Sequence, residues 1–272
     1  WENEKDLFCL IGSKYVHGSL EGIYPRIEKD IKSQKRILFV GLPCQVAALK
    51  NVIIEKNLSA EGVYLVDLVC HGVPSLKLYK LWLKNLSKGR MIKRLSFRDK
   101  SCSWENYRIV LEFEDGSKYA KSHKRDPFFY GYLKNLYLNY HCYNCSFSQI
   151  PREGDITLGD YWGVSGYLDK AKGVSIVLLN NKQGKRLFGE LKNITFYKAD
   201  LNDAIKYNPR IAKGEISLPK IREYIFEKIS KNNFSIICFN KIIRRIRRKE
   251  ILSYFLRGFK KLLKGKTNGS AG

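Results

Sequence analysis

Short apolar runs, each followed by a turn and a helical pattern, constrain most strongly how this chain folds. RILFV (residues 36–40) precedes a helix expected over about 45–50, and VYLVDLV (residues 63–69) precedes one expected over about 76–86. Runs this short and this apolar are typical of strands buried in a parallel sheet. GVSIVLL (residues 173–179) predicts a further buried strand. We therefore expect an α/β fold with a mainly parallel sheet and flanking helices.

A different pattern interrupts these α/β units. Residues 93–122 alternate polar and apolar side chains, with a turn signal at 114–116. Such alternation predicts an antiparallel β insertion beside the parallel sheet. Within it, Arg98, Asp99 and Trp104 either line a ligand groove or belong to a solvated loop near the hairpin.

Weaker signals predict the remaining elements. Ser75 and Asp126 are suited to cap the helices that follow them, and the aromatic helix expected over 126–138 should contribute to the core. The later elements are a strand at 155–158, a helix at 183–192, a strand at 194–197, a helix at 200–207 and a linker over 210–220.

Two cysteines stand where predicted strands end. Cys44 follows the first apolar run and Cys70 follows the second. If the two strands are neighbours in a parallel sheet, both cysteines lie at the same edge, where α/β folds bind ligands. A helix N-terminus also stabilises a thiolate, which applies to Cys44. Either cysteine alone is read as an inert buried thiol, but the pair at one edge favours a functional site.

The stretch HCYNCSFSQIPREGDITLGDYWG (residues 141–163) concentrates the other chemistry-bearing side chains. Cys142 and Cys145 are spaced so that one tight turn can present both thiolates to a single metal or cluster. Carboxylates, glycines and an aromatic side chain follow within this stretch. They are Gly154, Asp155, Gly159, Asp160, Trp162 and Gly163, preceded by Arg152.

Seven cysteines, an odd number without regular spacing, argue against a secreted disulfide scaffold. Four of them could converge, namely Cys44, Cys70, Cys142 and Cys145. One pair and two single cysteines suit a [4Fe–4S] cluster at a sheet edge better than a zinc ribbon. Spacing leaves both open, and His71 and His141 also allow a mixed Cys/His zinc site.

The segment GSKYV (residues 12–16) has two interpretations. It is an ordinary loop entering a strand, or a turn whose N–H groups and lysine hold a phosphate. Because the segment is no Walker motif, spacing alone favours the ordinary loop.

Positive charge dominates the chain and gathers near its C-terminal end. The formal net charge is +24, and between Lys241 and Lys266 eleven Lys or Arg stand against the single acid Glu250. Residues 220–263 read as helices with apolar positions among the cations, which predicts a basic amphipathic helix suited to an anionic membrane surface or an acidic partner. The alternative is a solvated terminal helix packed on the domain. No nucleic-acid-binding motif is present, so we expect no nucleic-acid partner.

Taken together, the motifs resemble one family. In order, they are GSKYV, LFVGLPCQVAALK, VDLVCHGVPS, SFRDK with Trp104 after it, CYNCSF, Arg152-Glu-Gly-Asp and DITLGDYWG. They are similar to the beta subunits of coenzyme F-420 (deazaflavin) hydrogenases and dehydrogenases, and the resemblance runs over residues 12–179. Members of that family are flavoproteins with iron–sulphur clusters, which pass electrons between clusters, FAD and a second substrate, the deazaflavin in the best-known cases.

The resemblance implies roles for particular residues. The cluster ligands would be Cys44, Cys70, Cys142 and Cys145, and the glycine-rich segments near Gly12, Gly41 and Gly159 would approach the flavin. No side chain stands out as a general acid or base. The full set of implied cofactor-binding residues is Gly12, Ser13, Lys14, Tyr15, Gly41, Pro43, His71, Gly72, Arg152, Asp155, Gly159, Asp160 and Trp162.

The resemblance also suggests a cellular setting. Full-length relatives often begin with a ferredoxin-like region, so we expect an N-terminally truncated chain and a redox partner protein or ferredoxin-like domain. The basic tail looks more like family members from surface-polysaccharide gene clusters than a hydrogenase subunit. We expect a flavin and iron–sulphur domain over residues 1–210, a helical extension over 211–272, and a cytoplasmic protein, peripheral to the inner face of the membrane if the tail binds lipid. The alternative is a non-enzymatic, zinc-stabilised module that docks on such a surface or partner.

Overall fold

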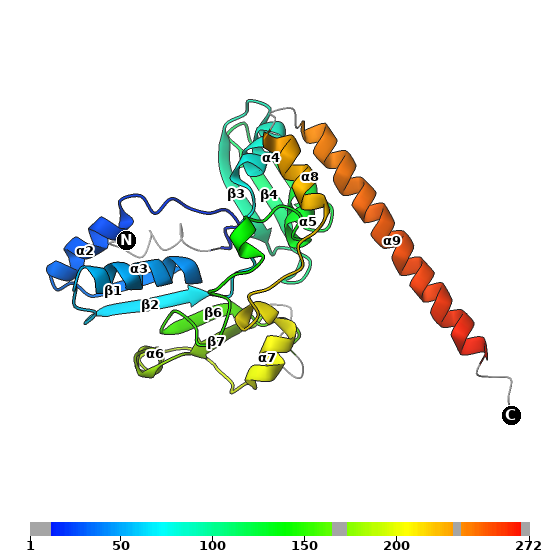
Figure 1. Cartoon of the computed structure of the whole chain (residues 1–272). Coiled ribbons are helices and arrows are strands. Elements are labelled where there is room, and N and C mark those ends of the chain that lie inside the picture. The colour runs from blue at the N-terminus through cyan, green and yellow to red at the C-terminus, as the bar shows by residue number, and fades with distance from the viewer. Residues whose placement is uncertain (1–11, 165–172, 231–234, 268–272) are drawn as a thin grey trace.

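Two sheets, with helices around them, form the body from which a long C-terminal helix extends (Figure 1). The computed structural model describes residues 12–164, 173–230 and 235–267. This arrangement confirms the expected α/β fold with a mainly parallel sheet, an antiparallel insertion and a helical C-terminal region.

The larger sheet has the order β1-β2-β6-β7. Its first three strands are parallel, and β7 runs antiparallel to β6. Gly41 lies opposite Asp67 and Leu68 opposite Leu158, so the carboxyl ends of the three parallel strands share one edge. The strands are β1 (Ile37–Gly41), β2 (Val63–Leu68), β6 (Ile156–Asp160) and β7 (Ser175–Leu179).

Helices α2 (Ile23–Lys32) and α3 (Pro43–Glu55) pack against β1 and β2 (Figure 1). Their fully or nearly buried side chains include Val46 and Leu49. Helix α3 is longer than predicted, because Pro43 fits the first helical turn and the Gln45 side chain accepts a hydrogen bond from the backbone N–H of Leu42 at 2.9 Å. This early start places Cys44 in the first turn of the helix.

The predicted antiparallel insertion is a separate three-stranded sheet of β3 (Ile92–Asp99), β4 (Arg108–Phe113) and β5 (Lys118–Ser122). An aromatic core joins this sheet to four helices. Phe128 and Phe129 in this core are fully buried, as expected for the aromatic segment. The helices are α4 (Leu76–Ser87), α5 (Pro127–Leu133), α8 (Ile221–Ser230) and the beginning of α9 (Ile236–Thr267).

Both predicted helix caps are confirmed. The Ser75 hydroxyl accepts the backbone N–H of Leu78, and the Asp126 carboxylate accepts that of Phe129 at 2.7 Å. Helix α5 ends sooner than expected because Asn135 adopts a left-handed conformation with φ 58°, which a continuing helix does not allow.

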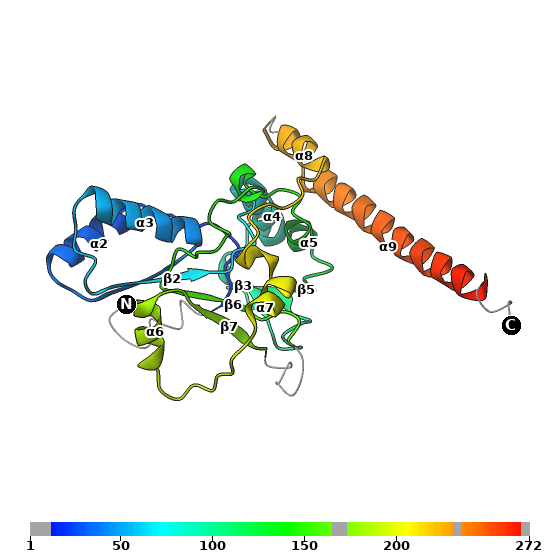
Figure 2. The ribbon, with the colours of Figure 1, turned by 60° about the horizontal axis from the view of Figure 1, so that its bottom comes forward.

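One prediction for the later chain is wrong. Residues 194–197 form no strand and pair with none of the strands in the described part of the chain, and Phe196 and Tyr197 are exposed. The stretch 210–220, expected as a linker, forms no helix or strand between the short turn η2 (Pro209–Ile211) and residue 221, and Arg210 and Ile211 in that turn are buried. The helices predicted nearby are present as α6 (Lys182–Gly189) and α7 (Leu201–Tyr207), which Figure 2 shows near the larger sheet.

In the described part of the chain, no helix is both long enough and apolar enough to span a bilayer.

Leu49 tests the packing of α3 on the sheet. Leu49→Ala should lower the free energy of unfolding by roughly 2–5 kcal/mol, because the lost side chain leaves a cavity in a close-packed site. Ile54→Ala on the same helix should change it by less than about 0.5 kcal/mol, since Ile54 is 70% exposed. Urea denaturation measures both, and equal losses would contradict this packing.

Candidate redox site

The parallel sheet brings two of the predicted ligands to one edge. Cys44 lies in the first turn of α3, directly after β1, and Cys70 follows β2. Because β1 and β2 are neighbouring parallel strands, the expectation that both cysteines share an edge is confirmed. The Cys44 side chain is exposed and Cys70 is half-buried.

The C-x-x-C pair approaches this edge from a different part of the chain. Cys142 ends a short turn, η1 (Tyr140–Cys142), and its sulphur accepts the backbone N–H of Val73 at 3.4 Å. A Cβ on Gly72 would lie 3.3 Å from the Cβ of Cys142, and Gly72 has φ 128°, so the loop after Cys70 needs glycine here. Cys145 is held by its N–H, which donates to Gly214 at 3.1 Å.

The four thiols are close enough for their charges to interact. Although Cys44 is exposed as a residue, partial desolvation of its thiol raises the pKa of that thiol; the neighbouring Cys145 and Cys142 thiols raise it further, while the N–H groups of the first turn of α3 lower it. Burial also raises the pKa of Cys70 to about 11, with smaller contributions from Cys142 and Cys44 that act in the same direction. Each of the four cysteines that the sequence singled out therefore lies near enough to at least one other for their charges to interact.

The four thiols do not converge on one point. Within residues 12–164, 173–230 and 235–267, no three His, Cys, Asp or Glu side chains are grouped tightly enough to hold a single metal ion. His141 is exposed, and the ring of His71 instead faces Tyr132 at 4.8 Å between centroids.

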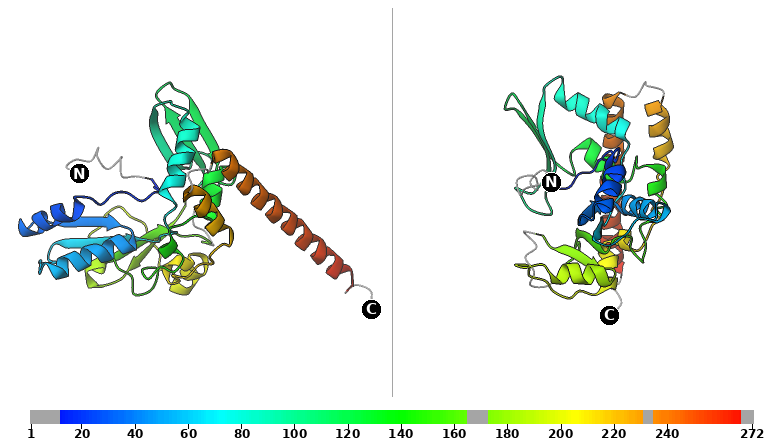
Figure 3. Two further views of the ribbon diagram at one scale, coloured as in Figure 1. Left: turned by 45° about the horizontal axis from the view of Figure 1, so that its top comes forward. Right: turned by 90° about the vertical axis from the view of Figure 1, so that its left-hand side faces the viewer.

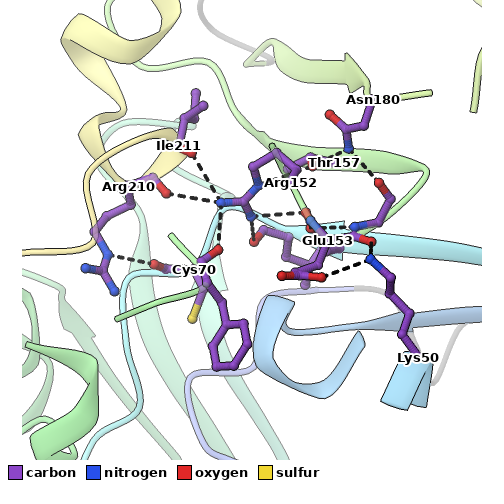
Figure 4. A network of polar contacts seen from close by, with 12 residues as sticks. Lys50, Cys70, Arg152, Glu153, Thr157, Asn180, Arg210 and Ile211 are labelled. Atoms are coloured by element: carbon purple, nitrogen blue, oxygen red, sulfur yellow. Dashed lines mark hydrogen bonds and ion pairs between the residues drawn. The ribbon is translucent and has the colours of Figure 1, made fainter. Parts of the chain in front are cut away.

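Arg210 joins the loops that carry these cysteines, and the sequence analysis missed it. Its guanidinium donates to the backbone oxygens of Cys70 at 3.1 Å, Gly214 at 2.6 Å and Cys142 at 3.3 Å. Figure 4 shows Arg210 beside Cys70. The same positive charge lowers the pKa of the Cys70 and Cys142 thiols, against the larger effect of burial. Among 50 Lys and Arg residues, no local signal distinguished this one.

Arg152, a predicted cofactor-binding residue, lies at the centre of a buried polar network (Figure 4). Its side chain is 1% exposed and forms an ion pair with the fully buried Asp67 at 3.1 Å. Because its side chain is almost fully buried and is tied to acceptors on several chain segments, Arg152 has a positioning role. The sequence analysis did not single out Asp67. Its position as a charged residue inside the apolar run of β2 is the signal that could have predicted a buried partner. The other acceptors of Arg152 are Phe147, Leu68, Thr157, Arg210 and Ile211.

Asp155 and Gly159 also serve the packing of the sheet. The Asp155 carboxylate accepts the backbone N–H of Leu65 at 2.7 Å and the side-chain amide of Asn181 at 2.7 Å. A Cβ on Gly159 would lie 2.8 Å from a methyl group of Val69, so glycine is required by close packing there.

Several other predicted residues lie close together around Arg98. Arg98 pairs with Asp160, which ends β6, and the Asp160 carboxylate also accepts the indole N–H of Trp104 at 3.4 Å. The rings of Trp104 and Trp162 are 4.3 Å apart between centroids. Arg98 and Trp104 thus join Asp160 and Trp162 in one aromatic and charged group. Asp99 lies outside the group and pairs with Arg108 at 3.1 Å.

Tyr15, from the GSKYV segment, connects this group to the cysteines. Burial raises the pKa of Tyr15, and contacts with Arg98 and Ser13 lower it. The ring of Tyr15 lies 5.3 Å from that of Tyr132, whose hydroxyl donates to the carbonyl of Gly72 at 3.0 Å. Packed aromatic side chains therefore fill the space between the two groups.

The remaining predicted residues lie apart from both groups or inside the packing. Gly12 and Lys14 are exposed, and the Lys14 ammonium donates to the carbonyl of Gly12 at 3.2 Å. Gly41 and Pro43 are buried in the turn between β1 and α3, where a Cβ on Gly41 would lie 2.8 Å from the ring of Phe39.

Comparison with known families decides the family of this chain. Residues 34–202 match the model described as the C terminus of the coenzyme F420 hydrogenase/dehydrogenase beta subunit. The chain belongs to this family. The match confirms the resemblance seen in the motifs and contains all four gathered cysteines, together with Arg98, Asp160 and Trp162. No curated protein matches the chain. The family description indicates a redox module of the hydrogenase or dehydrogenase beta-subunit kind.

The role of Arg152 is testable without any cofactor. Arg152→Met should lower the free energy of unfolding by roughly 3–5 kcal/mol, because it leaves the Asp67 carboxylate buried and unpaired. Adding Asp67→Asn to that variant should recover part of the loss. Urea denaturation of protein free of metal and flavin measures both, and an unchanged stability of the Arg152 variant would contradict a positioning role.

Proposed function

We propose that this chain is the cluster- and flavin-binding part of an oxidoreductase. It would pass electrons between a [4Fe–4S] cluster, FAD and a second substrate, for which the family name suggests the deazaflavin coenzyme F-420. The observation that carries the proposal is the gathering of Cys44, Cys70, Cys142 and Cys145 at the carboxyl edge of the sheet in a member of this family.

The arrangement of the thiols favours a cluster over zinc. A structural zinc ion needs its four ligands to converge on one point, about 2.3 Å from each sulphur. A [4Fe–4S] cluster takes four thiolates at separate corners and so suits donors that are near each other without converging. The described thiols are coupled in charge yet form no single-ion group. This spacing supports the proposal of a cluster.

The chain's own residues would hold and insulate this cluster. The N–H groups at the start of α3 point towards the Cys44 sulphur, and the N–H of Val73 donates to Cys142. The guanidinium of Arg210 fixes the loops of Cys70 and Cys142 and offsets part of their negative charge. His71 and Tyr132, packed behind Cys70, would exclude water from that side.

The group around Arg98 is the best candidate for the flavin. FAD presents an aromatic ring system and two phosphates, which call for an aromatic surface and positive charge. Trp162 is 36% exposed and offers a ring face, and Arg98 and Asp160 are polar groups fixed beside it. When bound, the flavin supplies the exchange between two-electron and one-electron chemistry. Tyr15 and Tyr132 would keep the space between the flavin and the cysteines closed to water.

A redox partner protein or a ferredoxin-like domain would exchange electrons with the cluster. The exposed position of Cys44 supports this, because it brings one predicted ligand to the surface. The competing proposal is a zinc-stabilised module without enzymatic activity, which uses the same cysteines. The metal that these cysteines bind, iron or zinc, distinguishes the two proposals.

Cysteine substitutions test the cluster. Cys142→Ser with Cys145→Ser should remove most of the iron and of the absorbance near roughly 400 nm from anaerobically reconstituted protein, because two of four ligands are lost. Cys102→Ser with Cys238→Ser is the matched control and should leave both unchanged, since neither residue lies in the gathered set. Unchanged iron in the first variant would refute the ligand assignment, and one zinc per chain without colour would favour the zinc module.

Trp162 tests the flavin site. Trp162→Leu should weaken FAD binding by roughly tenfold, the effect of losing an aromatic contact worth about 1.4 kcal/mol. Phe196→Leu removes a more exposed aromatic ring, at 68%, far from Arg98 in sequence, and should leave the affinity unchanged. Isothermal titration calorimetry with FAD measures both, and an equal effect of the two substitutions would place the flavin elsewhere.

A further inference from the structure

Helix α9 packs on the body along its first half, as far as Glu250, which contacts Tyr130 and Lys134. It has 32 residues and is therefore about 48 Å long at 1.5 Å per residue. It contacts α5 and α4, and Figures 1 and 3 show its remainder extending away from the rest of the molecule. A helix that extends from a body in this way leaves most of its surface available to a partner.

The first half of α9 turns its apolar side to the body. Phe239 and Ile243 are buried, and Ile242 and Ile246 pack against the same aromatic core. The opposite side carries exposed cations. These are Lys241, Arg244, Arg245, Arg248 and Lys249.

The apolar side of the helix changes half-way along it. Ile242 and Ile251 are nine residues apart, as are Ile243 and Leu252, and nine residues correspond to about two and a half turns. Each second member therefore lies on the side opposite the body-facing apolar residues. Ile251, Leu252 and Leu256 are 54%, 60% and 55% exposed.

The sequence predicted an amphipathic helix with one apolar side along its length, and this change of side corrects that expectation. The side of α9 that faces away from the body, here called the outer side, therefore carries cations in its first half and exposed apolar residues after them. Arg248, Leu252 and Leu256 follow one another at four-residue spacing, so the exposed apolar residues continue the side on which the cations lie. Because the body packs on the opposite side of the first half, a flat surface can approach this outer side without meeting the body.

We propose that the outer side of α9 binds the surface of an anionic lipid membrane. Ile251, Leu252 and Leu256 would enter the boundary between headgroups and acyl chains, and the cations of the first half would contact the headgroups. Phe259, Leu262 and Leu263 continue the apolar sequence beyond them.

Charge favours lipid over a second copy of this chain. Lys241, Arg244, Arg245 and Arg248 form no ion pair within the part of the chain that the structure describes. Each cation near an anionic surface contributes about 1 kcal/mol, whereas two copies of a chain with net charge +24 repel each other.

The test uses the full chain and sedimentation with vesicles. Binding to vesicles of phosphatidylcholine mixed with phosphatidylglycerol should be at least about tenfold tighter than to phosphatidylcholine alone, and should weaken with added salt. Ile251→Ser, Leu252→Ser and Leu256→Ser together should weaken it by at least about tenfold. The matched control is Ile54→Ser, Met91→Ser and Leu191→Ser, which removes apolar side chains at least 50% exposed on the body, keeps the charge, and should bind as the unaltered chain does.

A second pair of variants tests the cations. Arg244→Gln, Arg245→Gln and Arg248→Gln should weaken binding and reduce its salt dependence, whereas Lys29→Gln, Lys93→Gln and Lys185→Gln carry the same change of charge and should have a smaller effect. Equal binding to both kinds of vesicle, no binding, or equal losses in variants and controls would overturn the proposal. Dimerisation that depends on Leu252 in analytical ultracentrifugation, without vesicle binding, would show instead that the outer side pairs with a second copy.

Discussion

The buried ion pair between Arg152 and Asp67 is the interaction on which the rest of this structure depends. Asp67 lies near the carboxyl end of β2, and Arg152 lies in the segment that leads into β6, so the pair fixes how these two chain segments meet. Asp67 also accepts the backbone N–H of Gly154 at 2.9 Å. A buried ion pair is stable only when the remaining donors and acceptors of both side chains form hydrogen bonds. The Arg152 guanidinium meets this need by also donating to backbone oxygens.

The same network reaches the cysteines through η2. Arg152 donates to the backbone oxygen of Ile211, and Arg210 beside it donates to those of Cys70 and Cys142. Two neighbouring arginine side chains therefore connect the sheet edge, the turn η2 and the loops that present the thiols. A cluster with several thiolate ligands needs such fixed loops and a nearby positive charge, and this chain provides both from one short turn.

Local sequence patterns predicted the buried strands and the helix caps, because these features depend on residues close together in the chain. The apolar runs of β1 and β2 placed Cys44 and Cys70 at one edge, and the identities of Ser75 and Asp126 predicted two helix caps. Arg210 could not be found in this way, because its partners lie far from it in sequence. Residues 194–197 carry strand-like side chains but pair with none of the described strands, and only the folded chain shows this. In α9, composition indicated an amphipathic helix, whereas the change of side emerged only when Ile243 was seen buried and Leu252 exposed.

The content of acid-labile sulphide tests the central claim most directly. Inorganic sulphide belongs to an iron–sulphur cluster and to neither a zinc site nor a single bound iron. The chain reconstituted anaerobically with iron and sulphide, then freed of excess reagents, should hold about four iron and about four sulphide per chain if its four gathered cysteines bind a [4Fe–4S] cluster. Protein that retains zinc and no sulphide after the same treatment would contradict the account.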